Sequence, residues 1–193
     1  MEIRTSRLVL REFEESDAPS ANTYESDAEV VRYQTHGPRS LDESLAYIQQ
    51  VRTTTAAQTP RRLFDLAITH NDQFVGRVGL NIKDPALGEG ELWYILHPAH
   101  WGQGLVPEAA RAMLELGFGE LGLHRIIIDT DPRNHASVRV AQKLGMRQEA
   151  HFVENFFAKN EWSDSLIFAL LRREWPGVNP AAAATSKVGS DLS

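Results

Sequence analysis

The apolar positions at the start of the chain predict a β-strand followed by helices. Apolar side chains recur from Glu2 to Phe13, and the polar stretch 14–17 ends that strand. Helical spacing then predicts a first helix over about 16–33. A second helix is predicted to begin at Ser40, because Ser40 and Glu43 match a capping box and apolar positions continue to Val51.

The middle of the chain has the pattern of an antiparallel meander. Three strand-like runs cover 63–69, 74–82 and 91–96. The turn-rich stretches 70–73 and 83–90 separate them, and such short polar connections favour neighbouring antiparallel strands.

After the glycine-rich stretch 101–104 the period changes from strand to helix. Apolar positions at helical spacing continue to Gly119, and the run 125–130, with three consecutive isoleucines, predicts a buried strand. A further helix follows, which Asn134 or Ser137 would cap and Gly145 would end; the last two predicted strands are 146–157 and 165–171.

This order of elements predicts an α/β fold, with a mixed central sheet of about seven strands flanked by about four helices. With 193 residues, 42% of them hydrophobic, the chain is long enough for one sizeable core and short for two domains. We expect one domain over 1–175. Residues 176–193 are rich in Pro, Ala, Gly and Ser and are predicted to form a flexible tail.

Composition narrows the chemistry. The chain has no cysteine, which excludes disulfides, cysteine-ligated metals and an acyl group carried on an enzyme thiol, and we expect no metal. The net charge of −6 argues against non-specific nucleic-acid binding. No apolar run approaches the ~18 residues that a membrane span needs, and charges interrupt the first ten residues, so we expect a cytoplasmic protein without a membrane partner.

Two segments carry candidate chemistry. In 91–108 a strand leads through a loop with two glycines into a helix, and successive amides at a helix N-terminus favour an anion such as a pyrophosphate. An ordinary glycine-containing turn is the alternative. In 131–146 a strand leads into a helix with Asn134 and Ser137 at its start, a pattern that by itself is more often a helix cap.

Together these segments resemble the GNAT N-acetyltransferases, whose loop has the form Gln/Arg-x-x-Gly-x-Gly/Ala and whose later helix follows Asn-x-x-Ser. The likeness runs from Arg4 to Trp175. The segment 5–11 resembles the opening strand of the ribosomal-protein (Rim-type) N-terminal acetyltransferases, and 161–164 and 169–175 resemble the closing strands of that branch.

The resemblance implies acetyl-coenzyme A as co-substrate, with its pantetheine arm between two splayed strands. Asn134 would bind the pantetheine amide, and amides near Ile95 and Leu96 would polarise the acetyl carbonyl. Ser137 would protonate the departing thiolate, although a first-turn role in the helix is an equal alternative. The cofactor-binding residues so implied are Tyr94, Ile95, Leu96, His97, Trp101, Gly102, Gln103, Gly104, Leu105, Val106, Asn134, Ser137, Arg139 and Lys143.

The sequence departs from the family pattern at several positions. Trp101 replaces the usual Gln or Arg, and Val106, which replaces Gly or Ala, would crowd a tight turn. Trp93 stands where relatives often have Gly, so one side of that strand is expected to be partly filled. Phe156 stands where some ribosomal-protein enzymes place a glutamate, so the base falls to Glu91, with Glu154 and His97 as further candidates.

The absence of a glutamate at position 156 affects which acceptor amines we expect. An α-amine with a pKa near ~7.8 is about 10–15% neutral at pH 7, whereas a lysine amine near ~10.4 is neutral to only about 0.04%. We therefore predict that the acceptor is an α-amine of a protein N-terminus or a small amine, which attacks the thioester directly in a ternary complex. Polyamines, amino acids and aminoglycoside-like drugs stay open as acceptors, as does a regulatory module that binds acetyl-coenzyme A without catalysis. A homodimer is possible in this family.

Overall fold

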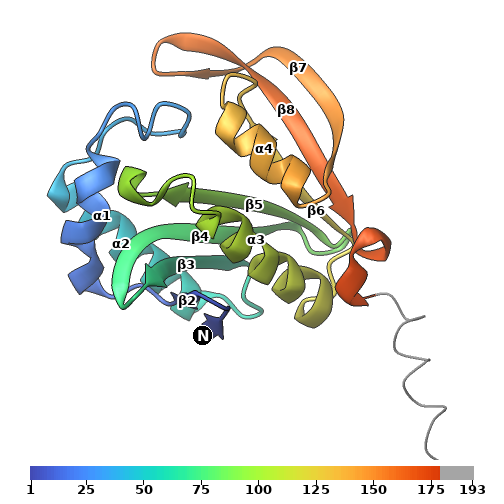
Figure 1. Ribbon diagram of the computed structural model, residues 1–193, viewed down its shortest axis with the longest axis horizontal. Helices are drawn as coiled ribbons and strands as arrows, with labels where there is room; N and C mark the ends of the chain where they lie inside the picture. Colours follow the sequence, from blue (N-terminus) through green and yellow to red (C-terminus); the bar gives the residue numbers. More distant parts are fainter. Residues whose placement is uncertain (179–193) are drawn as a thin grey trace, which may run out of the picture.

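The computed structural model describes residues 1–178 as one twisted sheet with helices on both faces (Figure 1). The sheet has eight strands in the order β1-β2-β3-β4-β5-β6-β8-β7, antiparallel except for the parallel pair β5 and β6. The strands are β1 (Glu2–Arg4), β2 (Leu8–Arg11), β3 (Leu63–His70), β4 (Gln73–Asp84), β5 (Glu89–Leu96), β6 (Arg125–Thr130), β7 (Arg147–Ala158) and β8 (Glu161–Leu171). The helices are α1 (Ala18–Glu25), α2 (Leu41–Ala57), α3 (Leu105–Glu115) and α4 (His135–Lys143). The predicted α/β class, meander and helix order are confirmed.

The predicted first strand, Glu2 to Phe13, is wrong in one respect: it is a hairpin of β1 and β2. Thr5 closes the turn, since its amide donates to the Leu8 carbonyl at 2.9 Å and its hydroxyl accepts from the Leu8 amide at 3.0 Å. A threonine that satisfies the backbone locally favours a turn over an extended strand. The strand pair contributes the eighth strand of the sheet.

The predicted first helix, 16–33, is also too long, because α1 ends at Glu25. The Ser26 hydroxyl donates to the Asn22 carbonyl at 2.7 Å, and the Asp27 carboxylate accepts from the Glu29 amide at 2.9 Å. These local hydrogen bonds compete with helix continuation. The residues that follow form a loop, which reappears below as part of the site. The predicted capping box of α2 is confirmed, with Ser40 accepting from the Glu43 amide.

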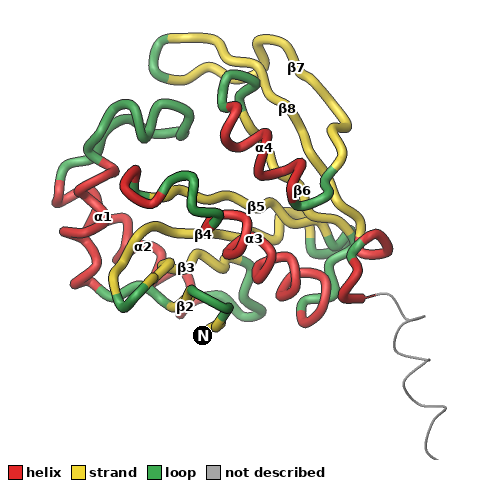
Figure 2. Tube along the Cα trace, viewed as in Figure 1, coloured by secondary structure: helices red, strands yellow, loops and turns green. Residues whose placement is uncertain are grey.

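Successive side chains along the strands point to opposite faces of the sheet, where they join two separate apolar clusters. In β3, Leu66 and Ile68 belong to the large apolar cluster under α3 and α4, whereas Ala67 between them packs with Ile48 and Val51 of α2. Helices α1 and α2 therefore cover one face of the sheet and α3 and α4 the other, as the tube in Figure 2 shows.

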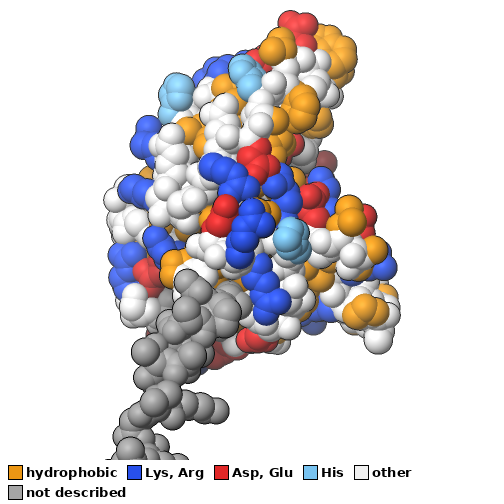
Figure 3. All heavy atoms as spheres, turned by 90° about the vertical axis from the view of Figure 1, so that its right-hand side faces the viewer, with side chains coloured by type: hydrophobic (Ala, Val, Ile, Leu, Met, Phe, Trp, Pro, Cys, Tyr) orange, Lys and Arg blue, Asp and Glu red, His pale blue; other side chains and the backbone are white. Residues whose placement is uncertain are grey.

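The chain after α3 follows the prediction closely. A π-helical turn, Leu116–Glu120, extends α3 past the predicted limit at Gly119, and β6 is buried as expected. The hairpin of β7 and β8 exposes large apolar side chains, which gather at the top of Figure 3: Phe152, Val153, Phe156, Phe157 and Trp162.

At the C-terminal end, Trp175 is buried and residues 176–178 form a short 3-10 turn beside it. The rest of the predicted tail, 179–193, lies outside the described residues. Over residues 1–178, no helix is both long and apolar enough to cross a membrane.

Candidate active site

The site lies where β5 and β6 separate. These parallel strands pair only from Glu89 with Arg125 to Glu91 with Ile127. Beyond that point β5 continues to Leu96 paired with β4 alone, while β6 keeps its other partner, β8. The sheet is therefore open between the two strands, with unpaired backbone groups on β5 that a bound molecule can reach.

A cavity of about 610 Å³ lies on the α3 and α4 side of this opening. Twelve of the predicted cofactor-binding residues line it: Tyr94, Ile95, Leu96, Trp101, Gly102, Gly104, Leu105, Val106, Asn134, Ser137, Arg139 and Lys143. The loop after α1 forms the far wall with Arg32, Tyr33 and Gln34, which the sequence pattern did not indicate. A cavity of this size and mixed lining is typical of a ligand site.

The N-terminus of α3 has the geometry of an anion site. Gly102 and Gly104 have positive φ angles of 75° and 76°, a conformation that favours glycine. Gly104 is the N-cap and has no side chain to accept hydrogen bonds from the first-turn amides, which therefore stay available to a ligand at the positive end of the helix dipole. These groups fit a diphosphate.

Two departures from the family motif have structural reasons. The indole Nε1 of Trp101 donates to the Leu96 carbonyl at 2.8 Å, so this residue ties the loop to the end of β5. Val106 does not crowd a tight turn, because it lies in α3 rather than in the turn and is half-buried at the cavity wall.

The third departure fills the opposite face of the sheet. The ring of Trp93 lies over Gly79 of β4, where a Cβ atom would come within 2.1 Å of it. Alternation along β5 places Trp93 on the face away from Leu92, and therefore away from α3. The filled side is the side of α1 and α2.

Glu108 anchors the loop to the other end of the chain. Its Oε1 accepts from Thr5 Oγ1 at 2.6 Å, and its Oε2 accepts from Arg7 Nε at 2.7 Å. The Ser6 hydroxyl and the Arg7 amide also donate to it, both at 2.9 Å. Partial burial alone would raise the pKa of Glu108, but these hydrogen bonds outweigh burial and lower its pKa to about 2. Arg7 also donates to the Gln103 carbonyl at 2.9 Å, which holds the glycine loop in place.

Ser137 and Tyr94 meet in the cavity. The Tyr94 hydroxyl lies 2.9 Å from Ser137 Oγ, and burial raises the pKa of Tyr94 to about 12, so the phenol is protonated at neutral pH. Asn134 is the N-cap of α4, and its side chain accepts from the Ser137 amide at 3.1 Å. The helix cap therefore does not need the Ser137 hydroxyl, which is left to Tyr94 and the cavity.

Four predicted residues lie outside this cavity. His97 accepts from the Ala99 amide at 3.1 Å, and Gln103 donates to the Ala99 carbonyl at 3.1 Å, so both side chains shape the loop. Glu91 lies on a second cavity and is paired with Lys83 at 3.0 Å. Glu154 lines neither cavity; it sits in the irregular part of β7 with a φ of 46°, and its amide donates to Asp164.

The second cavity, of about 200 Å³, meets the first at Arg32, Tyr33 and Gln34. Residues 32–35, in the loop between α1 and α2, form one wall of this cavity. The other walls come from β5, from β6 and the residue after it, and from the β7–β8 hairpin. It is lined by five carboxylates: Glu91, Asp129, Asp131, Glu161 and Asp164. Phe156, at the position expected for a base in some relatives, also lines it.

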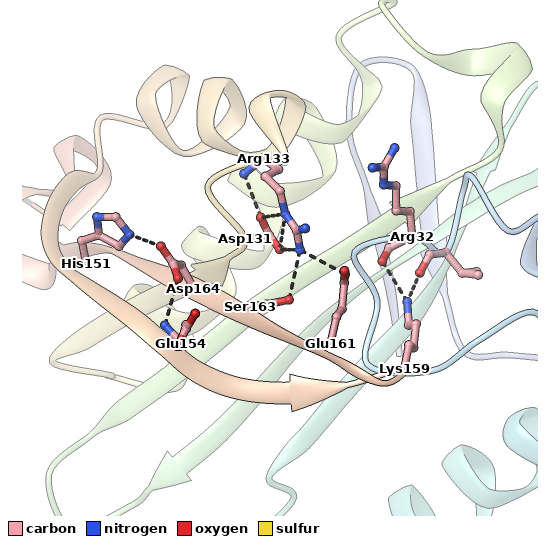
Figure 4. Close-up of polar contacts among 10 residues, drawn as sticks. Arg32, Asp131, Arg133, His151, Glu154, Lys159, Glu161, Ser163 and Asp164 are labelled. Atoms are coloured by element: carbon pink, nitrogen blue, oxygen red, sulfur yellow. Dashed lines mark hydrogen bonds and ion pairs between the residues drawn. The ribbon is translucent and has the colours of Figure 1, made fainter.

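Figure 4 shows the polar contacts of the hairpin beside this cavity. Lys159, at the hairpin turn, donates to the carbonyls of Val31 and Arg32 at 2.7 and 2.8 Å. Arg133 bridges Asp131 at 2.6 Å and Glu161 at 3.2 Å. The loop after α1 and the hairpin are thus held together at the walls of the second cavity.

The comparisons with known proteins agree with this geometry. Residues 7–147 match the family model described as the acetyltransferase (GNAT) domain. The chain is 34% identical over 177 residues to YnaD of Bacillus subtilis, an uncharacterised N-acetyltransferase; the match covers 91% of this chain and 99% of that protein.

Solved structures share the fold. A GNAT-family acetyltransferase from Bacillus anthracis has 29% identity and a TM-score of 0.80, covering 90% of this chain and all (100%) of that one. RimL, a ribosomal L7/L12 α-N-protein acetyltransferase solved with coenzyme A, has a TM-score of 0.79 at 17% identity, covering 89% of this chain and 98% of RimL. The family model covers most of the chain, and YnaD is 34% identical to it over nearly its whole length. The chain therefore belongs to the GNAT acetyltransferases and is an acetyl-CoA-dependent N-acetyltransferase.

Proposed function

We propose that the chain acetylates an α-amino group, of a protein N-terminus or a small molecule, by direct attack within a ternary complex. One observation carries this proposal: two cavities lie on either side of the β5–β6 opening and meet at residues 32–34. The first contains a helix terminus that suits an anion, and the second is lined by carboxylates, which attract a cationic amine.

Acetyl-coenzyme A supplies the activated thioester. In this proposal the first-turn amides of α3 bind its diphosphate, and Arg139 and Lys143 add positive charge along the same cavity. Asn134 contacts the pantetheine amide region. The His97 amide donates to Val75 of β4, so alternation directs the Ile95 amide to β4 as well and leaves the Leu96 amide facing the opening. Leu96 is therefore the donor placed to polarise the acetyl carbonyl.

The proposed acid for the leaving thiolate is Ser137, supported by Tyr94. We expect Ser137→Ala to lower kcat about tenfold, because general acid catalysis typically contributes 10²–10⁴-fold and the Tyr94 hydroxyl partly substitutes. The KM for acetyl-CoA should stay within about twofold. Steady-state assays of thiol release measure both, and Ser137→Thr, which keeps the hydroxyl, is the matched control. An unchanged kcat in the alanine variant would show that the hydroxyl has a packing role only.

The preference for α-amines follows from basicity. Carboxylates are the acidic groups of the acceptor cavity, and a carboxylate is a poor base for a lysine ammonium with a pKa near ~10.4 but an adequate one for an α-amine near ~7.8. The resemblance of 5–11, 161–164 and 169–175 to the Rim-type enzymes supports the same acceptor. A polyamine is the second candidate, favoured by the five carboxylates around the cavity.

A panel of amines tests the proposal. Thiol release from acetyl-CoA should be faster, by kcat/KM at pH 7, with a peptide bearing a free N-terminal alanine than with the same peptide N-blocked and carrying one lysine. Spermidine tests the polyamine as acceptor. Faster turnover of spermidine than of the α-amine peptide would show that a polyamine, and not an α-amine, is the preferred acceptor. A chain that binds acetyl-CoA in calorimetry yet acetylates none of these amines would be a binding module, contrary to the proposal.

A further inference from the structure

Asp129 occupies a distinctive position on β6. It lies two residues beyond Ile127, the last residue of β6 that pairs with β5. Its neighbours Ile128 and Thr130 are buried, and Ile128 belongs to the core beneath α3 and α4. Because successive side chains point to opposite faces of a strand, Asp129 faces the other side, where it is exposed and lines the acceptor cavity.

The other carboxylates of this cavity have cationic partners. Lys83 lies 3.0 Å from Glu91, and Arg133 lies 2.6 Å from Asp131 and 3.2 Å from Glu161. His151 lies 2.7 Å from Asp164, which also accepts from the Glu154 amide. Within residues 1–178, Asp129 is the cavity carboxylate that has no Lys, Arg or His nitrogen within 4.0 Å. Its carboxylate is therefore the one in this cavity that no ion pair within the described residues holds.

The surroundings make Asp129 a better proton acceptor than an ordinary aspartate. Partial desolvation by the surrounding cavity walls raises its pKa, and the nearby Glu91 carboxylate adds to this. A hydrogen bond from Ser165 and the positive charge of Lys83 oppose the shift without reversing it. By contrast, hydrogen bonds from Arg133 lower the pKa of Asp131 against the effect of its burial, and those from the Glu154 amide and His151 lower the pKa of Asp164. An efficient base combines an accessible lone pair with a pKa closer to the working pH.

We propose, on the basis of the acetyl transfer proposed above, that Asp129 is the general base that takes the proton from the acceptor nitrogen. The nitrogen lone pair forms the C–N bond to the acetyl carbon as the C–S bond breaks, and the electron pair of that bond leaves on sulfur. Sulfur takes a proton from Ser137, and the surplus proton on nitrogen passes to Asp129. Solvent then removes the proton from Asp129 and restores the one on Ser137.

This assignment replaces the sequence-based choice of Glu91. Glu91 sits on the same face, but a proton acceptor paired with an ammonium at 3.0 Å loses that interaction when it is protonated. Glu91 acts on Asp129 instead, through the repulsion between two carboxylates that raises the pKa of Asp129.

The first test is Asp129→Asn, which keeps the shape and removes the basic site. With the N-terminal alanine peptide we expect kcat to fall about 100-fold and the Kd for acetyl-CoA from calorimetry to stay within about twofold. Asp129→Glu, which restores a carboxylate, should recover part of the loss. Asp72→Asn is the control, since Asp72 lies in the exposed β3–β4 turn with a φ of 60° that asparagine tolerates.

The second test does not depend on activity. Carboxyl carbon-13 NMR of the free chain should show two aspartates titrating above the ordinary value, because burial also raises the pKa of Asp65. The Asp129 signal should be the one of the two that is absent from Asp129→Asn. The wild-type kcat should fall as pH drops through that pKa, because the base must be ionised, and the asparagine variant should lack this limb. The titratable or charged groups facing Asp129 or its cavity are Lys83, Glu91, Asp131, Arg133, Glu161, Asp164, Lys159, Arg32 and Tyr33.

The outcomes separate this inference from the proposed function. If the wild type acetylates the peptide and Asp129→Asn retains kcat within about twofold, or if Asp129 titrates at or below the ordinary aspartate pKa, Asp129 is not the base and the acetyltransferase reading stands. If the wild type binds acetyl-CoA and acetylates no amine of the panel, the proposed function itself is overturned, and the inference with it.

Discussion

Replacing Glu108 with glutamine should lower the free energy of unfolding by about 2–3 kcal/mol and weaken acetyl-CoA binding several-fold. The carboxylate receives five donors from Thr5, Ser6 and Arg7, two of them from the Arg7 guanidinium at 2.6 and 2.7 Å. Hydrogen bonds to a charged group contribute about 1.5–3 kcal/mol each, and glutamine loses the charge for all of them. The loss reaches the loop because the same Arg7 holds the Gln103 carbonyl.

The effect should depend on pH in a defined direction. The folded-state pKa of Glu108 is lowered to about 2, below the unfolded value near ~4.3, so this stabilisation is complete above that unfolded value and is lost as pH falls toward 2. Urea unfolding at pH 7 and at pH 3 should therefore show a smaller difference between wild type and variant at the lower pH. Glu115→Gln, an exposed position on the same helix, should change little at either pH. Equal losses in the two variants would contradict the anchoring role.

Gly76→Ala should cost about 3 kcal/mol of stability and reduce kcat. An added Cβ would lie 2.4 Å from the Ile95 carbonyl oxygen and 3.0 Å from the Leu96 Cα, both main-chain atoms of β5, so the two strands would have to move apart. That movement displaces the Leu96 amide proposed to polarise the acetyl carbonyl. Thermal unfolding and thiol-release assays measure the two effects.

Gly119→Ala is the matched control. An added Cβ there meets nothing within 4 Å, and the substitution reduces the freedom of the unfolded chain, so we expect no loss and a gain of up to ~1 kcal/mol. Because the same entropic gain applies at Gly76, a stable and active Gly76→Ala variant would mean that β4 and β5 tolerate a wider spacing than the structure has.

Much of the fold was predictable because its signals are local. Three isoleucines in succession predict the buried β6, and the helical spacing after Gly104 predicts α3. The element boundaries were predicted wrongly where a side chain hydrogen-bonds to the backbone of a nearby residue. Thr5 turns the first predicted strand into a hairpin, and Ser26 and Asp27 end α1 early. Such competition leaves the hydrophobic pattern unchanged, so the pattern could not reveal it.

The surroundings of the second cavity were not predictable in the same way. The sequence pointed to Glu91 as base. The structure places Glu91 against Lys83, and it lines the second cavity with residues of the loop after α1 and of the β7–β8 hairpin. Both features depend on pairs of residues far apart in the chain, for which a single sequence carries no signal.

The sequence by itself determined the order of the elements, the glycine loop ahead of α3 and the absence of thiol chemistry, because periodicity, capping and composition act between near neighbours or over the whole chain. Only the tertiary structure decided that β5 and β6 part after Glu91, that Tyr94 meets Ser137, and that Asp129 lacks a cationic partner among the described residues. Strand order and register set these contacts, and they arise from packing of the whole domain rather than from any one segment.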